Sequence, residues 1–391
     1  MRTRSLLALT ALLALTSTLA ACGDDDDGAP LADAGPGGPD GSTPGTDAGP
    51  VFPPGFESDE CLCLALGVDY MNNVGVATVL GVPSLKTMVD VDSAGISGDP
   101  VVRYHEGKFY VVNRLANNLT IIDTATLTID AQFVLGENGQ NAQDVAIRGR
   151  EAWVVSLGVP KVKIFDLDHT DATPTEIALP TIAADIDGNP DANSIVIVGD
   201  QAFVSLQHLN DEFTPSAPGG VVVIDAAAKT VTTTLELPEK NPINFLRTDG
   251  QSVYAGLVPD YDPTHGCLVR ITTGATPAAE CVLSSTALTG YVNGIAPAAD
   301  GSLFVAVGTS FTTGIGQHVL ADGTLEAGGD WSKKGQQPTD VAACGTYVVA
   351  NDGASGLRVY DTAAGSELTT TALDVGEPAA FASGIACFAR P

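Results

Sequence analysis

The sequence predicts an all-β protein, a seven-bladed β-propeller whose last blade is closed by strands from both ends of the folded chain. First, a phrase recurs, because QNAQDVAIRGREAWVVS at 140–156 and QQPTDVAACGTYVVAND at 336–352 share one pattern. Second, the copies are spaced by about 40–50 residues, the period of four-stranded propeller blades. Third, alternating apolar runs end in turns, and Gly (43) and Pro (24) are frequent, as many short strands require.

Composition restricts the classes of partner. The chain has 391 residues, of which 44% are hydrophobic and 17% charged, so most of it is globular. Its formal net charge is −29. Phosphate backbones and anionic lipid surfaces attract Lys and Arg, so we expect no nucleic-acid partner and no direct adhesion to an anionic membrane surface.

The first residues are typical of an export signal. Arg2 and Arg4 precede the apolar stretch 6–15, which is too short to be a good membrane span. The stretch 19–22, Leu-Ala-Ala-Cys, then resembles the lipobox of bacterial lipoproteins. That resemblance implies a signal peptide over 1–21 and acylation, including palmitate, at Cys22. Because Gly23 follows instead of Asp, it also implies the outer membrane. The alternative is an ordinary secretory signal with a chance cysteine.

Residues 22–58 are predicted to be a disordered tether that carries the anchor. Asp24–Asp27 form an acidic run, and Asp-Ala-Gly-Pro occurs at 33–36 and again at 47–50. Acidic, Gly/Pro-rich sequence buries too little apolar area to fold. We therefore expect residues up to about 55 to pack against nothing, and the propeller domain to occupy 59–391.

Each blade is expected to contain four strands, the second with an aromatic residue beside Val and the third often ending in Asp. Residues 379–391 hold a first strand only, and residues 61–98 hold second, third and fourth strands only. Joined, they make a seventh blade in which 384–388 lie beside 61–67, and the closed ring has no open sheet edge. The six complete blades are predicted at 99–139, 141–188, 189–240, 241–288, 290–336 and 337–378.

The stretch FYVVNRLANNLTIIDT at 109–124 resembles the YVTN-type β-propeller repeat family. The resemblance is strong over 107–126, moderate at 149–168 and 345–362, and weak over 241–336. It implies a seven-bladed propeller. It does not imply one activity, because the family includes surface-layer, periplasmic and enzyme-like members, and function depends on a site.

A small polar residue begins each predicted innermost strand, and these starts converge on one mouth of the central channel. Carboxylate and amide oxygens suit a hard cation such as Ca²⁺, and calcium-dependent lactonase-type propellers are similar in placing such a ring there. The structural alternative is that Asp and Asn recur because they favour tight turns. The candidate ring consists of Asp99, Asp144, Asn193, Asn244, Asn293, Asp340 and, in the split blade, Ser383.

The two longest predicted loops between second and third strands, 207–220 and 258–266, open on the same face. Loops that lengthen in only two neighbouring blades suggest a patch shaped for a ligand or partner. The candidate contacts in these loops are His208, Asp211, Glu212, Tyr261, Asp262 and His265.

Two functions follow from these features. The first is a monomeric, non-catalytic envelope lipoprotein whose propeller binds a protein or glycan in the cell envelope and requires no cofactor. It agrees with the absence of the usual motifs for haem, zinc, nucleophilic or phosphate chemistry. The alternative is a Ca²⁺-dependent lactonase-type hydrolase. Its metal ligands would be Asp144, Asn244, Asn293 and Asp340, and His208 or His265 would be the base.

With Cys22 assigned to lipid, six of the seven cysteines remain, an even number in an exported protein. Cys267 and Cys281 fall on the third and fourth strands of one blade, so we expect a cross-strand disulfide. Cys61 and Cys63 are expected to bond to residues 344 and 387, in either combination, across the closing seam. The alternative is that these are buried free thiols.

Overall fold

The computed structural model describes residues 51–91, 93–137, 140–182, 185, 187–310, 312–333, 336–377 and 384–390. The predicted signal peptide, Cys22 and most of the tether lie outside the described residues, as does Ser383. Within the described ranges, no helix has the length and apolar character needed to cross a membrane.

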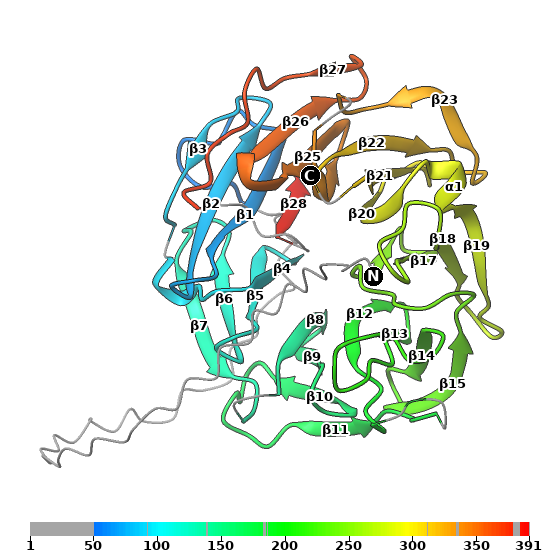
Figure 1. Cartoon of the computed structure of the whole chain (residues 1–391). Helices are drawn as coiled ribbons and strands as arrows, with labels where there is room; N and C mark the ends of the chain where they lie inside the picture. The colour runs from blue at the N-terminus through cyan, green and yellow to red at the C-terminus, as the bar shows by residue number, and fades with distance from the viewer. Residues whose placement is uncertain are drawn as a thin grey trace, which may run out of the picture. The chain divides into compact units, whose positions relative to one another are not determined.

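Seven four-stranded antiparallel sheets stand around a common centre, which confirms the predicted propeller (Figure 1). Blade 1 combines the two ends of the folded chain, and each other blade uses four successive strands. The strands of blades 1 to 3, from the innermost outward, are β28 (Ile385–Ala389), β1 (Cys61–Asp69), β2 (Val74–Val82), β3 (Thr87–Met88); β4 (Pro100–His105), β5 (Lys108–Asn113), β6 (Asn118–Asp123), β7 (Ile129–Val134); β8 (Ala142–Arg148), β9 (Glu151–Ser156), β10 (Lys161–Asp166), β11 (Thr175–Ala178).

The remaining blades repeat this order, and one short helix, α1 (Ser285–Leu288), connects blades 5 and 6. Their strands are β12 (Ala192–Val198), β13 (Gln201–Leu206), β14 (Gly220–Asp225), β15 (Thr230–Glu236); β16 (Arg247–Thr248), β17 (Ser252–Leu257), β18 (Cys267–Thr272), β19 (Ala279–Ser284); β20 (Tyr291–Pro297), β21 (Leu303–Gly308), β22 (Gly314–Val319), β23 (Leu325–Asp330); β24 (Pro338–Cys344), β25 (Tyr347–Asp352), β26 (Leu357–Asp361), β27 (Ser366–Glu367).

The recurring residues of the sequence have recurring physical tasks. The aromatic residue of the second strand is fully buried at Phe109, Trp153 and Phe203, where it packs between neighbouring blades. Burial of such a side chain is worth about 1.5–3 kcal/mol. The Asp that ends the third strand closes the next turn. Asp123 Oδ1 accepts from the backbone N–H groups of residues 125 and 126, both at 2.9 Å. Each repeat therefore encodes one core contact and one turn.

The ring closes as predicted. β28 pairs antiparallel with β1 in a register that runs from Cys61 opposite Ala389 to Ala65 opposite Ile385. In Figure 1 the red C-terminal strand lies beside the blue first strand. Because β28 is the innermost strand of blade 1, the two ends of the folded chain are held in one sheet.

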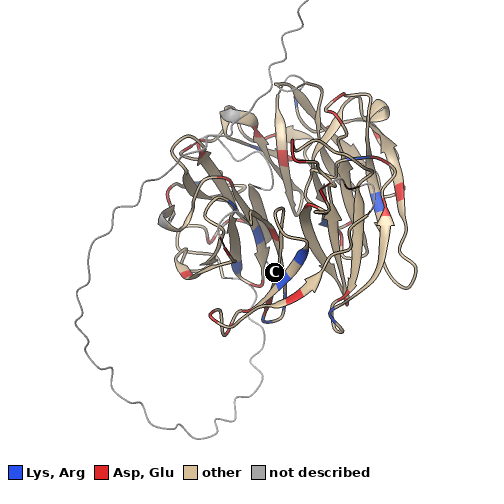
Figure 2. Cartoon of the chain, turned by 60° about the horizontal axis from the view of Figure 1, so that its bottom comes forward, with Lys and Arg blue, Asp and Glu red and all other residues tan. Residues whose placement is uncertain are grey.

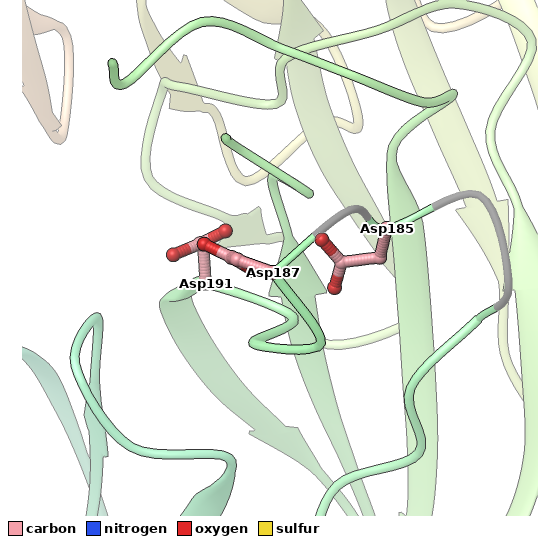
Figure 3. Close-up of side chains that lie close together, drawn as sticks. All are labelled: Asp185, Asp187 and Asp191. Carbon is pink, nitrogen blue, oxygen red and sulfur yellow. The ribbon is translucent and has the colours of Figure 1, made fainter. Parts of the chain in front are cut away.

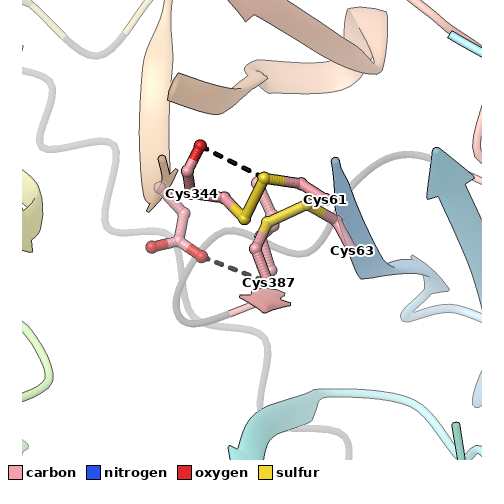
Figure 4. The surroundings of a disulfide bond; sticks show 6 residues. Cys61, Cys63, Cys344 and Cys387 are labelled. Atoms are coloured by element: carbon pink, nitrogen blue, oxygen red, sulfur yellow. Dashed lines mark hydrogen bonds between the residues drawn. A yellow bond between two sulfur atoms is a disulfide. The ribbon is translucent and has the colours of Figure 1, made fainter. Parts of the chain in front are cut away.

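Two disulfides clamp this seam and confirm the predicted set of partners (Figure 4). Cys61 bonds to Cys344 at the end of β24 in blade 7, and Cys63 bonds to Cys387 on β28. The linked residues are 283 and 324 positions apart. In the chain-entropy model, closing one loop of this size stabilises by about 5 kcal/mol. The second bond contributes less, since the first already closes nearly the same loop.

Cys267 and Cys281 are free thiols, in contrast to the predicted cross-strand bond. The two lie on β18 and β19 as expected, but the ladder shifts register between Leu268 and Val269. Cys267 therefore faces Ser284, and Cys281 is paired with Val269. The bulge places the two cysteines diagonally instead of directly opposite each other.

The folded body begins earlier than predicted. Phe56 is completely buried and Phe52 is 8% exposed, and both belong to the core between blades 1 and 2. The Phe52 ring meets Phe388 edge-on at 5.3 Å between centroids, and the Arg390 guanidinium lies 4.6 Å from its centre. The stretch 51–58, assigned to the tether by its acidic and Pro-rich neighbours, is therefore part of the propeller, and the boundary at 58 is wrong.

Candidate functional site

The predicted ring at the channel mouth is occupied by bonds between blades. Asp144 is fully buried, and its Oδ2 accepts from Ser194 Oγ at 2.6 Å and from the Ile195 N–H at 3.0 Å in the next blade. Arg103 of the preceding blade donates to the same oxygen at 2.8 Å. One carboxylate thus joins blades 2, 3 and 4.

The Asn members of the ring make the same kind of link through their amide nitrogens. Asn193 donates to the carbonyls of Pro242, at 3.2 Å, and Ile243, at 2.9 Å. Asn244 donates to the carbonyl of Val292, and Asn293 to that of Pro338 at 3.2 Å. Each acceptor lies in the following blade. Four members of the ring therefore link their blade to the next one: Asp144, Asn193, Asn244 and Asn293.

The two remaining members are paired with arginines. Asp99 forms an ion pair with Arg114. Asp340 Oδ2 accepts from the Ile385 N–H at 3.2 Å, and Oδ1 lies 3.6 Å from Arg247. Burial raises the pKa of Asp340 and lowers that of Arg247 to about 10. These contacts account for the ring without a cation, which favours the structural alternative over a metal centre.

The candidate contacts of the two long loops divide into exposed and buried residues. Asp211, Glu212, Asp262 and His265 are exposed, and Tyr261 is 38% exposed beside Tyr291. His208 is only 2% exposed. The loop that carries His208 lies against the segment that precedes β12, which buries the imidazole. The role of these six residues as ligand contacts stays a prediction.

A groove between blades 6 and 7 is a concave site that the sequence did not indicate. Its volume is about 570 Å³, within the range of ~300–1,000 Å³ typical of small-ligand sites. Four aromatic or imidazole side chains line it: Phe304, His318, Trp331 and Tyr360. They come from β21, β22, β26 and the segment after β23. The weak repeat over 241–336 concealed this difference between blade 6 and the others.

The aromatic rings of the groove are held in fixed positions. The Trp331 indole donates to the Gln317 carbonyl at 3.0 Å and meets Tyr360 edge-on at 5.1 Å between centroids. Gly316 lies beneath that indole, where an added Cβ would come within 2.2 Å of the ring. His318 stacks on Phe304 at 4.7 Å. Phe304 (7% exposed) and Tyr360 (3%) are buried, whereas Trp331 and His318 are partly exposed. The surface offered to a ligand is therefore that of Trp331 and His318 on a rigid aromatic support, which binds flat faces with little loss of entropy.

The rim of the groove is acidic. Among the described residues that line it, four are carboxylates and none is Lys or Arg; the carboxylates are Asp300, Glu326, Asp330 and Asp361. His318 Nδ1 donates to Glu326 Oε2 at 2.8 Å. Figure 2 shows acidic residues on many loops and outer strands of the propeller, in keeping with the net charge of −29. This rim disfavours anionic ligands.

A second chemical cluster lies between blades 3 and 4. Among the described His, Cys, Asp and Glu side chains, one group brings its ligand atoms within 4.8 Å of one another: Asp185, Asp187 and Asp191. Figure 3 shows the three carboxylates on the segment between β11 and β12. Sequence reasoning missed them, although the alternating pattern Asp-x-Asp-x-Asn-x-Asp over 185–191 was visible.

Comparison with known proteins supports the fold. No family model matches the chain, and no curated protein matches it. A functionally unknown protein from Desulfotomaculum acetoxidans DSM 771 is 13% identical with a TM-score of 0.54, over 85% of this chain and 100% of that one. A streptogramin B lyase is 15% identical with a TM-score of 0.51, over 71% of this chain and 83% of that one. At these identities the likeness concerns the propeller alone; the YVTN-type repeat and the lipobox stay predictions.

Proposed function

We propose that this protein is a non-catalytic lipoprotein of the bacterial outer membrane whose propeller binds a saccharide in the groove between blades 6 and 7. The observation that carries the proposal is the pair of partly exposed rings in the groove, Trp331 and His318, held in place by the buried Tyr360 and Phe304. One face of a hexose ring presents C–H bonds that pack on aromatic rings. Its hydroxyl groups donate to carboxylates, and the groove supplies both kinds of partner.

The acidic rim narrows the class of saccharide. A sulfated, phosphorylated or uronic chain would meet Asp300, Glu326, Asp330 and Asp361 with like charge, which costs binding energy at short range. A neutral or amino-bearing sugar avoids that repulsion, and an ammonium group gains from it. The proposed ligand is therefore a neutral or amino-bearing glycan of the cell envelope.

The expected anchor fits this role. A Cys22 lipid followed by an acidic, Gly/Pro-rich chain would hold the propeller near the membrane and leave it free to reorient. The lactonase-type alternative has less support. The Asp144 and Asp340 carboxylates that it would use as ligands are engaged by Arg, Ser or backbone N–H groups.

Tryptophan fluorescence tests the groove directly, since the chain has two tryptophans and Trp153 is fully buried. Oligomers of N-acetylglucosamine, glucosamine and glucose, with heparin as the anionic control, are titrated against the mature chain. We expect neutral or amino oligomers to change the Trp331 emission, and heparin to have no effect. Calorimetry then compares Trp331→Ala with Phe213→Ala, a control because Phe213 is 63% exposed in a distant loop.

We expect Trp331→Ala to weaken binding at least about tenfold, or about 1.4 kcal/mol, and Phe213→Ala to leave it unchanged. If no saccharide binds and an apolar peptide binds in the same groove, the ligand is a peptide and the saccharide proposal is wrong. Equal loss in both variants would place the site elsewhere.

For the anchor, Cys22→Ser should release the protein from the membrane fraction; retention of that variant there would contradict lipidation.

A further inference from the structure

In the segment before β12, the buried carboxylate of Asp185 has no hydrogen-bond donor. The Asp185 side chain is 0% exposed, and neither of its carboxylate oxygens has a hydrogen-bond partner. Asp191 is 5% exposed and lies in the same group, with the exposed Asp187. Burying one carboxylate without a donor is costly, and bringing others beside it costs more. Such a cluster is stable when a cation shares its charge.

We propose that Asp185, Asp187 and Asp191 bind a Ca²⁺ ion between blades 3 and 4, a site separate from both the channel mouth and the saccharide groove. Ca²⁺ coordinates oxygens at ~2.3–2.6 Å, so two ligand atoms on one ion lie within about 5 Å of each other. The three carboxylates meet this condition at 4.8 Å. No protein nitrogen or sulfur belongs to the group, which is the donor set of a hard cation.

A fourth oxygen is available beside the group. Asn189 donates through Nδ2 to Asp191 Oδ1 at 3.0 Å and to the Leu157 carbonyl at 2.7 Å. Its Oδ1 is buried and has no hydrogen-bond partner. The four side chains alternate along the chain at 185, 187, 189 and 191, the odd-position spacing by which calcium loops direct successive side chains to one ion. Gly188, at φ +75°, allows the turn between them.

An independent element points a buried polar atom at the same place. His208, from the loop between β13 and β14, is 2% exposed, and its Nδ1 has no hydrogen-bond partner. That atom lies 3.5 Å from Asp185 Oδ2. It is outside the group of close ligand atoms, so His208 is a positioning residue that would donate to Asp185 once the carboxylate is held by an ion.

The proposed ion would join two loops. The Asp191 carboxylate accepts from the Leu209 N–H at 2.7 Å, and the His208 N–H donates to the Pro190 carbonyl at 3.3 Å. Pro190 and Asp191 are thus already bonded to the start of the long loop of blade 4. A cation on the three aspartates would fix this junction and, with it, the loop that carries Asp211, Glu212 and Phe213.

The test uses the full mature chain, freed of metal with EDTA and dialysed. Thermal unfolding and calorimetry are measured with Ca²⁺, Mg²⁺ and Zn²⁺, on the wild type, Asp185→Asn, Asp187→Asn and His208→Gln. Asp262→Asn is the matched control, because Asp262 is an exposed acid in the other long loop. Saccharide titration of the same samples reports the groove separately, so failure of one site does not mask the other.

We expect one Ca²⁺ per chain and a melting temperature that rises with Ca²⁺ concentration, as binding to the folded state alone requires. Asp185→Asn and Asp187→Asn should weaken Ca²⁺ binding at least 100-fold; His208→Gln should weaken it about tenfold with the stoichiometry kept. Asp262→Asn should bind as the wild type. If Asp185→Asn does not fold, the Ca²⁺ affinity of Asp187→Asn decides the test, because Asp187 is exposed. No melting shift at 10 mM Ca²⁺, a shift unchanged in both Asp variants, or stabilisation by Zn²⁺ alone would each overturn the proposal.

Discussion

Asp144, in the innermost strand of blade 3, and Asp185, between blades 3 and 4, are both buried aspartates, yet they have opposite hydrogen-bond surroundings. Asp144 accepts from Arg103, Ser194, the Ile195 N–H and its own neighbour's N–H at 2.8 Å. Asp185 accepts from none of the donors in the described chain. The contrast separates two uses of one residue type: a saturated carboxylate holds blades together, and an unsaturated one implies a missing partner.

The charges nearby differ in the same way. Arg103 and Arg247 lie beside Asp144 and Asp340 in the channel. The Asp185 group has Asp187, Asp191 and His208 for neighbours. Burial raises the pKa of Asp185 and raises that of Asp191 to about 7. Burial lowers the pKa of His208, against the opposing influence of Asp185. The channel aspartates are balanced by arginines, whereas the three carboxylates of the Asp185 group share one histidine, His208, whose Nδ1 lies 3.5 Å from Asp185 Oδ2.

The largest effect is expected at Asp144. Asp144→Ala removes the acceptor of Arg103, Ser194 and Ile195 and leaves a partly buried guanidinium without its carboxylate. Loss of one partner of a buried pair costs about 3–5 kcal/mol. Urea unfolding should show this loss in the free energy of unfolding, with Ca²⁺ affinity unchanged. A loss below about 1 kcal/mol would contradict the structural role of the ring.

Asp185→Asn is expected to change stability in the opposite direction. In EDTA it removes a buried charge without donors and supplies an amide that can donate to the neighbouring carboxylates. We expect the metal-free variant to gain about 1–2 kcal/mol in the free energy of unfolding. In excess Ca²⁺ the order should reverse, because at 100 times Kd the wild type alone gains about 2.7 kcal/mol. Destabilisation in both buffers would mean that Asp185 stabilises the fold itself and is not a Ca²⁺ ligand.

Asn193→Ala gives an intermediate effect within the ring. The amide bonds to Pro242 and Ile243 are lost, and two carbonyls at the junction of blades 4 and 5 lose a donor. A net loss of about 1–3 kcal/mol is expected. Hydrogen exchange should show the change first at β12 and β16. An unchanged melting curve would mean that water replaces the amide at no cost.

The smallest effect is expected at Asp262. This exposed residue accepts from Thr264 within its own loop, with the backbone contact at 2.8 Å. Asp262→Ala should leave the free energy of unfolding unchanged within the error of the measurement. A clear loss of stability in urea titration, or a loss of Ca²⁺ binding, would show that the exposed loop, and not only the buried aspartates, stabilises the fold or binds the ion.

The fold was predictable because each repeat carries its own local reasons. Phe109, Trp153 and Phe203 mark second strands, and the Asp residues after third strands close turns whatever the rest of the chain does. The split blade followed from a first strand without successors. The burial of Phe52 and Phe56 was not predictable from the sequence. Nothing in their acidic, Pro-rich segment shows that Phe52 contacts Phe388 and Arg390 at the other end of the chain.

The sites were less accessible from sequence. The ring residues were found, but their partners lie one blade further along, where no pattern within a repeat shows which carbonyl accepts. Trp331 falls after a strand in a divergent repeat, so its place beside Tyr360 depends on how two blades pack. The aspartates at 185, 187 and 191 resemble an ordinary acidic loop until the fold buries two of them beside His208.

The seam also determines how the propeller would respond to mechanical force. A pull on the chain before Phe52 is transmitted through the buried Phe56 to β1, a strand of nine residues that contains both Cys61 and Cys63. From there the load divides covalently, to β24 through Cys344 and to β28 through Cys387. Tension would therefore be shared by blades 7 and 1 before β1 could be peeled from its sheet. Under reducing conditions the same pull would act on hydrogen bonds alone, which yield one pair at a time from the end.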